Sequence, residues 1–282
     1  MKKFTAFKII STPFLPDLIS GLLWELDITG ITEEENNLLA YASCDSKIDE
    51  ESVIKLLAKL RSQNIIESFS ISSEIQEDKN WNELWENSRE VIRISDRIVV
   101  KPTFKIYEPK HNDIVVTIDP KMSFGTGEHQ TTKLVIKFFE KFIKQGMQVL
   151  DVGSGTGILA ITALKLGASY AVAVDNDEVC YENCLENSIL NKVEDRINII
   201  NGTITDVTEK DFDIVVANIQ ENILIEIAEQ IAEKIKLNSI VILSGLLDKD
   251  ESNVIKVYQS LGLNHVETIV GDEWIALVLV AH

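Results

Sequence analysis

Apolar positions along the first 75 residues recur with two spacings, and each spacing indicates a kind of element. Alternating apolar positions predict strands, and apolar positions three or four apart predict helices. The predicted order is strand, helix, strand, strand, helix, strand, over residues 4–10, 13–27, 28–31, 38–42, 49–62 and 69–75. This order is typical of a ferredoxin-like α+β domain. Such a fold specifies no chemistry by itself.

The next segment, residues 76–112, is polar and aromatic, and we interpret it as a linker. Trp81 and Trp85 lie four apart on a predicted helix, a spacing that favours packing of one helix face against a neighbouring domain. A surface that contacts substrate is the alternative. Short strands are predicted at 91–94 and 98–101, and a third, at 114–118, opens the last segment, residues 113–282.

From Gln145 the pattern changes to alternating strands and helices, which indicates a parallel sheet with helices on both faces. Predicted strands cover 147–152, 169–175, 197–201, 212–219 and 239–245, and helices lie near 158–166, 177–190, 221–235 and 248–261. Three residues separate the last two apolar runs, 265–270 and 274–282, so these runs form an antiparallel hairpin. Five parallel strands and a hairpin indicate the α/β, Rossmann-like, seven-stranded methyltransferase fold. A dinucleotide dehydrogenase would continue with parallel strands.

Charge and composition narrow the class of partner. The 282 residues carry 27 Lys and Arg against 45 Asp and Glu, a formal net charge of −18. This charge argues against nucleic-acid or anionic-membrane binding, which need a positive face, and favours a cationic partner. No apolar run approaches the ~20 residues that span a bilayer. Cys44, Cys180 and Cys184 are too few for a disulfide framework, so we expect a cytoplasmic protein and, since nothing demands more, a monomer.

A glycine-rich segment lies where the first parallel strand passes into its helix. In Asp151-Val-Gly153-Ser-Gly155-Thr-Gly157 the glycines are two apart, which lets the backbone approach a ligand and leaves helix N–H groups facing it. A dinucleotide fingerprint instead has its last two glycines three apart. The acidic Asp151 would repel a pyrophosphate but suits a ligand with an ammonium and a sulfonium. A tight structural turn is the alternative.

Two polar side chains end later strands of the predicted sheet. Asp175 follows Gly153 by twenty-two residues, where a carboxylate can accept hydrogen bonds from both ribose hydroxyls. A helix cap is the alternative, which we assign to Asp177 instead. Asn218 ends the fourth strand at the edge where open α/β sheets bind ligands, and its carbonyl oxygen can accept a hydrogen bond from an amine. A turn residue is the alternative for Asn218.

The segment DPKMSFGTGEHQTT, residues 119–132, leads into an amphipathic helix. Its turn-forming residues and its Thr-Thr helix start predict an ordered loop whose N–H groups and hydroxyls suit the carboxylate of a methionine moiety. We expect His129 to cap or pack rather than react. Cys180 and Cys184 share a helix face without a third ligand at zinc spacing, so we expect core packing there and no metal.

These segments together resemble the ribosomal protein L-eleven methyltransferase family, commonly called PrmA. The resemblance rests on DPKMSFGTGEHQTT, VLDVGSGTGILAITALKLGA, VDNDEVC and VVANI, and extends to WNELWE and the N-terminal domain. It implies a substrate-recognition domain over residues 1–75, a linker over 76–112 and a catalytic domain over 113–282. It also implies S-adenosylmethionine as methyl donor and methylation of lysine side chains and the N-terminal α-amine of a large-subunit ribosomal protein.

Carried over by motif, the cofactor-binding positions are Thr132, Gly153, Asp175 and Asn218, beside Asp151 and Gly155 of the glycine segment. The expected reaction is in-line transfer of the sulfonium methyl group to a neutral amine. Asn218, the expected catalytic residue, orients the lone pair of the amine while solvent takes its proton. Other acceptors, whether a protein, an RNA or a small molecule, are one alternative. A non-catalytic domain that binds ligand is another.

Some positions depart from the family pattern, and they put substrate contacts rather than the cofactor site in doubt. These positions are Glu128, Gln130 and the run Gln220-Glu221-Asn222. An acid at Glu221 either favours a cationic substrate or only stabilises the first turn of a helix.

Overall fold

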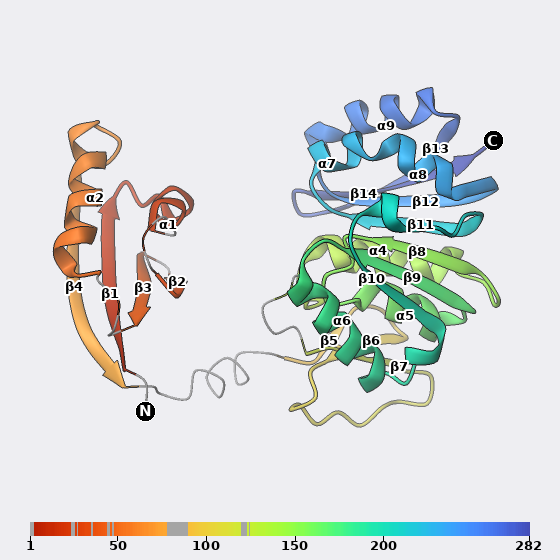
Figure 1. Ribbon diagram of the computed structural model, residues 1–282, viewed down its shortest axis with the longest axis horizontal. Coiled ribbons are helices and arrows are strands. Elements are labelled where there is room, and N and C mark those ends of the chain that lie inside the picture. Colours follow the sequence, from red (N-terminus) through yellow and green to blue (C-terminus); the bar gives the residue numbers. More distant parts are fainter. Residues whose placement is uncertain are drawn as a thin grey trace. The chain divides into compact units, whose positions relative to one another are not determined.

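The computed structural model describes residues 3–23, 26, 28–34, 36–43, 46, 48–77, 90–119, 123 and 125–282. The chain divides into two compact units, Met1–Ser88 and Arg89–His282. Figure 1 shows both, and each is described by itself. Cys44 and the predicted linker tryptophans, Trp81 and Trp85, lie outside the described residues. So do residues 120–122 and 124 of the segment that precedes the first catalytic helix.

The first unit has the predicted ferredoxin-like order. Its strands are β1 (Lys3–Thr12), β2 (Gly30–Glu34), β3 (Asn37–Ser43) and β4 (Ser68–Glu77), and its helices are α1 (Pro16–Leu23) and α2 (Glu50–Ser62). The sheet is antiparallel in the order β2-β3-β1-β4. Alternate residues of the strands, such as Phe7 and Ile9, share one buried cluster with Ile19 of α1 and Leu57 of α2. Both helices therefore cover the same face of the sheet.

The second unit begins earlier than the boundary at residue 113 that we predicted. Strands β5 (Ile92–Arg93), β6 (Ile98–Lys101) and β7 (Ile114–Thr117) form a small sheet in the order β5-β6-β7. Ile98, Val100 and Val116 are buried in one apolar cluster with Ile158 of the catalytic core. Residues 90–112, which we assigned to the linker, therefore pack with the second unit because their apolar side chains have their core there.

A seven-stranded sheet forms the centre of the described second unit. Its strands are β8 (Gln148–Val152), β9 (Tyr170–Asp175), β10 (Ile197–Asn201), β11 (Phe212–Asn218), β12 (Ile235–Leu247), β13 (Leu263–Gly271) and β14 (Trp274–Ala281). The order is β10-β9-β8-β11-β12-β14-β13. The first five strands in this order are parallel, and β14 is antiparallel to both its neighbours. This arrangement confirms the predicted parallel sheet and terminal hairpin.

Helices cover both faces of this sheet (Figure 1). One face carries α4 (Gln130–Phe142), α5 (Ile158–Leu166) and α6 (Glu178–Leu190), and the other carries α7 (Glu221–Glu226), α8 (Ala228–Lys234) and α9 (Glu251–Ser260). Successive strand residues point to opposite faces, so Val149 belongs to the first core and Leu150 to the second. Among the helices in the described residues, none is long and apolar enough to cross a membrane.

Three predicted bounds were wrong in the second half of this unit. The helix predicted at 221–235 is two helices, because Ile227 leaves helical geometry with φ −95° and ψ 9°. Strand β12 begins at Ile235 rather than at 239. The helix predicted at 248–261 begins as a short 3₁₀ turn, Asp248–Asp250, and α9 starts only at Glu251.

Candidate active site

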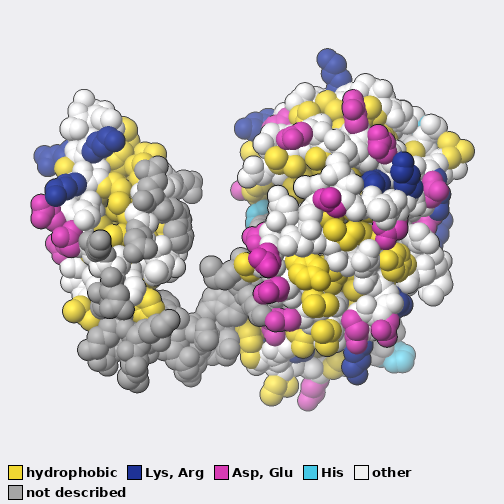
Figure 2. Space-filling model, viewed as in Figure 1, with side chains coloured by type: hydrophobic (Ala, Val, Ile, Leu, Met, Phe, Trp, Pro, Cys, Tyr) yellow, Lys and Arg dark blue, Asp and Glu magenta, His cyan; other side chains and the backbone are white. Residues whose placement is uncertain are grey.

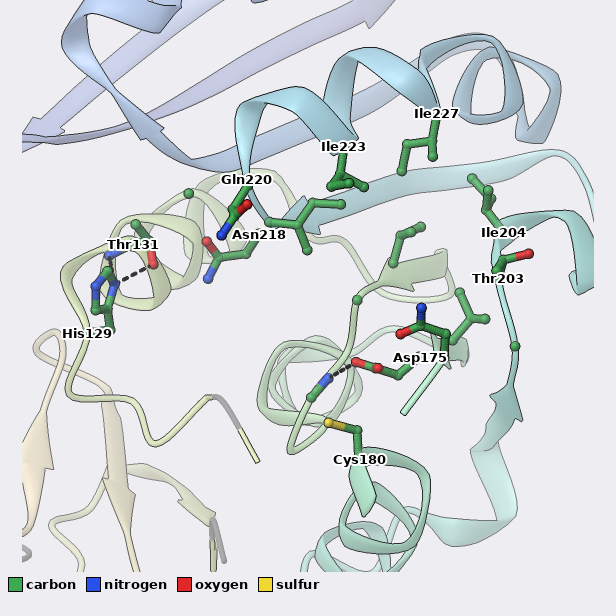
Figure 3. A pocket seen from close by; sticks show the side chains of 18 of the residues that line it. His129, Thr131, Asp175, Cys180, Thr203, Ile204, Asn218, Gln220, Ile223 and Ile227 are labelled. Carbon is green, nitrogen blue, oxygen red and sulfur yellow. Dashed lines mark hydrogen bonds between the residues drawn. The ribbon is translucent and has the colours of Figure 1, made fainter. Parts of the chain in front are cut away.

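A cavity of about 580 Å³ opens at the carboxyl ends of the parallel strands. Its walls include residues at or just after the ends of β8, β9, β10 and β11, namely Gly153, Asp175, Thr203 and Asn218 (Figure 3). The chain runs from β8 outward to β10 and then returns to place β11 on the other side of β8. The cavity therefore lies where the strand order reverses, which is where open α/β sheets bind ligands.

The glycine loop, residues 153–157, forms the floor of this cavity. Gly153 has φ 72° and Gly157 has φ 79°, in the left-handed region that favours glycine. A Cβ atom on Gly153 would lie 2.5 Å from Cγ2 of Ile219, and one on Gly157 would lie 2.4 Å from Sγ of Cys184. Both conformation and space therefore demand glycine, so the loop backbone is brought close to whatever occupies the cavity.

Asp175 lies on the cavity wall with its carboxylate held by backbone N–H groups. Its Oδ2 accepts from the Gly155 nitrogen at 2.8 Å, and its Oδ1 accepts from the Asp177 nitrogen at 3.1 Å. Because a carboxylate has about four acceptor positions, the oriented group retains capacity for two further donors. Asp177 caps α6 by accepting from the Val179 nitrogen at 2.9 Å, which confirms the predicted division of roles on the capping side.

Asp151, in contrast, lies behind the loop and is not part of the cavity wall. The side chain is fully buried, Oδ2 accepts from the Ala160 nitrogen at 3.0 Å, and Oδ1 has no hydrogen-bond partner in the described structure. Burial raises the pKa of this carboxyl to about 7, against the opposing effect of the Ala160 N–H group. The neighbouring charge of Asp175 raises it further.

Asn218 presents the other polar group of interest. Its Nδ2 donates to Oγ1 of Thr132 at 3.5 Å, while its Oδ1 is buried and has no partner among the described residues. A buried carbonyl oxygen without a hydrogen-bond donor costs free energy. We therefore expect this oxygen to accept a hydrogen bond from a ligand. Thr132 is fully buried behind Asn218, and the neighbouring Thr131 lines the cavity in its place.

His129 and Trp274 form an aromatic wall at the end of the cavity nearest Thr131. Their ring centroids are 5.0 Å apart and their planes are inclined by 66°. His129 also caps α4, because its Nδ1 accepts from the Thr131 nitrogen at 3.3 Å, so the predicted capping role is confirmed. In Figure 3 Asn218 lies between His129 on one side and Asp175 on the other.

Comparison with known proteins supplies the family. The family model described as ribosomal protein L11 methyltransferase (PrmA) matches residues 22–282. The chain belongs to the PrmA family. A ribosomal protein L11 methyltransferase from Brevibacillus brevis is 32% identical over 98% of this chain and 98% of its own length. One from Ruminiclostridium cellulolyticum is 37% identical over 72% of this chain and 65% of its own length.

A solved structure agrees with this assignment. The crystal structure of a ribosomal protein L11 methylase from Lactobacillus delbrueckii subsp. bulgaricus is 28% identical to this chain, with a TM-score of 0.65 over 69% of this chain and 100% of that one. The predicted resemblance and methyltransferase fold are therefore confirmed. PrmA enzymes are protein methyltransferases that depend on S-adenosylmethionine, so enzyme class and cofactor follow from membership.

The residues of the cavity fit this cofactor. A Cβ atom on Gly153 would close the approach that the loop leaves open, and the oriented Asp175 carboxylate suits ribose hydroxyls. Val174, Ile204 and Ile223 give the cavity apolar lining that suits an adenine ring. The volume lies within the ~300–1,000 Å³ of small-molecule sites. No cluster of metal-binding side chains occurs in the part of the chain that the structure describes.

Two of the positions that depart from the family pattern, Gln130 and Glu221, have side-chain partners in this PrmA chain. Nε2 of Gln130 donates to Oδ2 of Asp272 at 2.8 Å, which ties the start of α4 to the β13–β14 turn. Oε1 of Glu221 accepts from Nδ2 of Asn253 at 2.7 Å, in the first turn of α7. Gln220 lines the cavity directly.

Several lining residues were missed by the sequence analysis. They include Cys180, Gly202, Ile204, Ile223, Gly245 and Trp274. Trp274 follows the turn of the terminal hairpin, which has two residues, Asp272 and Glu273, rather than the predicted three, because Gly271 pairs with Trp274; its register opposite Leu247 of β12 brings it to the cavity. The sequence predicts that hairpin but contains no signal for its register.

Proposed function

We propose that this chain transfers the methyl group of S-adenosylmethionine to amino groups of ribosomal protein L11, on lysine side chains and on the N-terminal α-amine. The observation that carries the proposal is the buried Asn218 Oδ1, which has no donor among the described residues and belongs to the cavity wall. A neutral acceptor at this place suits an amine, because its N–H group can donate to the oxygen. Since ribosomal proteins are made in the cytoplasm, we propose that compartment.

The cavity residues divide between the two ligands. Gly153 and Gly155 would bring their backbone to the cofactor, and Asp175 would accept hydrogen bonds from its ribose. Thr131 and the N-terminal N–H groups of α4 would face its amino-acid portion, since a helix N-terminus favours a carboxylate. When bound, S-adenosylmethionine supplies an electrophilic methyl group on a sulfonium.

The acceptor must be deprotonated before it can attack. The pKa of a free lysine is about 10.4 and that of an α-amine about 8, and an apolar cavity lowers both. Asn218 Oδ1 would then hold one N–H of the neutral amine and orient its lone pair along the line of transfer. Nδ1 of His129 is engaged by both the backbone and the hydroxyl of Thr131, so we assign it no proton transfer. Solvent takes the proton instead.

The charge of the enzyme favours such a substrate. The chain has a formal net charge of −18, and α6, whose first turns adjoin the cavity at Cys180, exposes Glu178, Glu182 and Glu186. Figure 2 shows acidic side chains gathered along the left edge of the second unit. A negative field attracts a lysine-rich partner and raises its association rate.

We also propose that residues 1–75 recognise the protein substrate and that residues 76–89 connect them to the catalytic unit. The separate core of the first unit supports this division. Hydrogen exchange of the full chain with and without ribosomal protein L11 tests it. Protection within β1–β4 is expected, and protection confined to the second unit would contradict it.

Methyl transfer to purified ribosomal protein L11 tests the main proposal, with intact and peptide mass spectrometry as readout. Asn218→Ala removes the proposed contact, and Asn222→Ala, at an exposed position on α7, is the matched control. Mass gains of one or more methyl groups on lysines or on the N-terminus are expected with wild type and control but not with Asn218→Ala. Cofactor binding without any mass gain would redirect the search to other acceptors.

A further inference from the structure

Helix α6 and its C-cap residue carry three asparagines at four-residue spacing, Asn183, Asn187 and Asn191, and we call them the asparagine ladder. All three are buried, with exposed fractions of 1%, 0% and 7%. Asparagine is a poor helix former and is costly to bury unless it is hydrogen-bonded. Residues four apart lie on the same helix face. The ladder therefore makes a continuous polar stripe inside the fold.

The ladder binds backbone where β7 ends. Asn191 accepts from the Thr117 nitrogen at 2.9 Å and donates to the Thr117 oxygen at 2.6 Å. Oδ1 of Asn187 accepts from the Asp119 nitrogen at 3.0 Å, and Nδ2 of Asn183 donates to the Asp119 oxygen at 2.7 Å. The N–H and C=O groups of Thr117 and of Asp119 are thus all hydrogen-bonded by asparagine side chains of the ladder, as they would be by the backbone of a neighbouring strand. The ladder fixes the chain as it enters the pre-helix segment, residues 119–129.

Asn187 makes one more bond, and it reaches the cofactor loop. Its Nδ2 donates to the carbonyl oxygen of Thr156 at 2.9 Å. Thr156 lies between Gly155 and Gly157, and its own hydroxyl donates to the Gly125 oxygen at 2.7 Å. The glycine loop is therefore tied to Asp119 through Asn187 and to Gly125 through Thr156, on both sides of residues 120–124.

We propose that Asn187 is a positioning residue for methyl transfer. It holds the glycine loop against the start of the pre-helix segment at Asp119, so that Gly153 and Gly155 keep a fixed separation from His129 and Thr131 across the cavity. The methyl-transfer part of this inference rests on the proposed function. Its affinity part does not, because cofactor binding is measured without an acceptor.

Asn191 offers a matched control on the same helix. It is also buried, and in the described structure it binds Thr117 and the backbone of its own helix but not the glycine loop. Calorimetry of full-length Asn187→Ala and Asn191→Ala with S-adenosylmethionine compares the two, with thermal melts alongside. Both variants are expected to melt below wild type. Only Asn187→Ala is expected to raise the Kd, by about tenfold, the equivalent of about one hydrogen bond.

Thr156→Val provides a second test that keeps the side-chain shape and removes the hydroxyl, which donates to the Gly125 oxygen at 2.7 Å and accepts from the Ile158 nitrogen at 3.3 Å. A several-fold higher Kd for S-adenosylmethionine is expected, and this variant carries the test if Asn187→Ala fails to fold. An unchanged Kd in every folded variant of the Asn187–Thr156 pair would overturn the proposal. So would equal increases in Asn187→Ala and Asn191→Ala. If wild type binds the cofactor but leaves ribosomal protein L11 unmodified, the proposed function fails while these comparisons still decide the role of Asn187.

Discussion

Replacing Asp151 with Asn should stabilise the catalytic unit at neutral and alkaline pH. The carboxyl is fully buried, and β8 pairing places it beside Ala173 and Val216 in an apolar core. Its only hydrogen bond in the described structure comes from the Ala160 nitrogen, which an asparagine oxygen also accepts. The substitution therefore removes a buried charge at almost constant volume and keeps the bond.

The magnitude follows from the pKa of Asp151, which burial raises from 3.8 to about 7. A carboxyl with a raised pKa in the folded state contributes stability that is complete below its unfolded pKa and is lost as pH rises through its folded pKa. At about 1.4 kcal/mol per unit, the loss is about 1.5 kcal/mol at pH 5 and about 4 kcal/mol at pH 8. Any cost of burying the new amide is the same at both pH values and cancels in the comparison. The free energy of unfolding of Asp151→Asn, relative to that of wild type, should therefore increase by about 2.5 kcal/mol from pH 5 to pH 8.

Urea unfolding of wild type and variant at pH 5, 6, 7 and 8 measures this difference. The unfolding is monitored with spectroscopic probes that lie in the catalytic unit. Asp195→Asn, at an exposed position, is the control and should parallel wild type at every pH. The m value should stay constant, so that midpoints report stability alone. If the free energies of unfolding of wild type and Asp151→Asn changed in parallel from pH 5 to 8, the reasoning would be refuted, because Asp151 would then not titrate between these pH values.

Three further substitutions test the cavity. Asn218→Ala should lower the turnover number by about 100-fold or more, because the orientation of the amine is lost. It should change the Kd for S-adenosylmethionine by less than about threefold, because the cofactor contacts are kept. Steady-state kinetics and calorimetry measure the two quantities, and an unchanged turnover number would exclude this role. Gly153→Val should abolish cofactor binding, since its Cβ would lie 2.5 Å from Ile219 Cγ2 at φ 72°; retained binding in calorimetry contradicts this placement. Trp274→Ala should raise the Kd for S-adenosylmethionine several-fold, because the ring packs 5.0 Å from His129, which caps the helix whose N-terminus is proposed to face the amino-acid portion of the cofactor. Trp274→Phe should restore most of the affinity, and an unchanged Kd in Trp274→Ala would count against this wall of the cofactor site.

The elements that sequence predicts well are those set by local geometry. The glycine loop is one, because three left-handed residues at two-residue spacing need glycine wherever they occur. The terminal hairpin is another, because three residues between two apolar runs leave one way to connect them. Asp175 follows from its place at a strand end, where the chain must pass the cavity.

Features set by packing between distant segments were not predictable in the same way. Nothing in the residues around Ile227 marks the break between α7 and α8, since neither glycine nor proline occurs there. Leu224 and Ile231, on either side of the break, are buried in the same core. The asparagines of α6 look like ordinary surface residues in sequence, and only the path of β7 beside α6 gives them partners.

Asp151 and Thr132 show how far a motif determines a role. Both belong to segments that indicate cofactor binding, and both are fully buried one layer behind the cavity wall. The period of the strand explains Asp151, because residue 151 must share the α5 face with Val149 while Leu150 and Val152 share the other. Each acts on the cavity through a neighbour, Thr132 by holding the Asn218 amide and Asp151 by accepting from the Ala160 nitrogen beneath the loop. The motifs of this chain thus contain supporting residues as well as contacting ones, and for Asp151 the alternation of the strand separates the two.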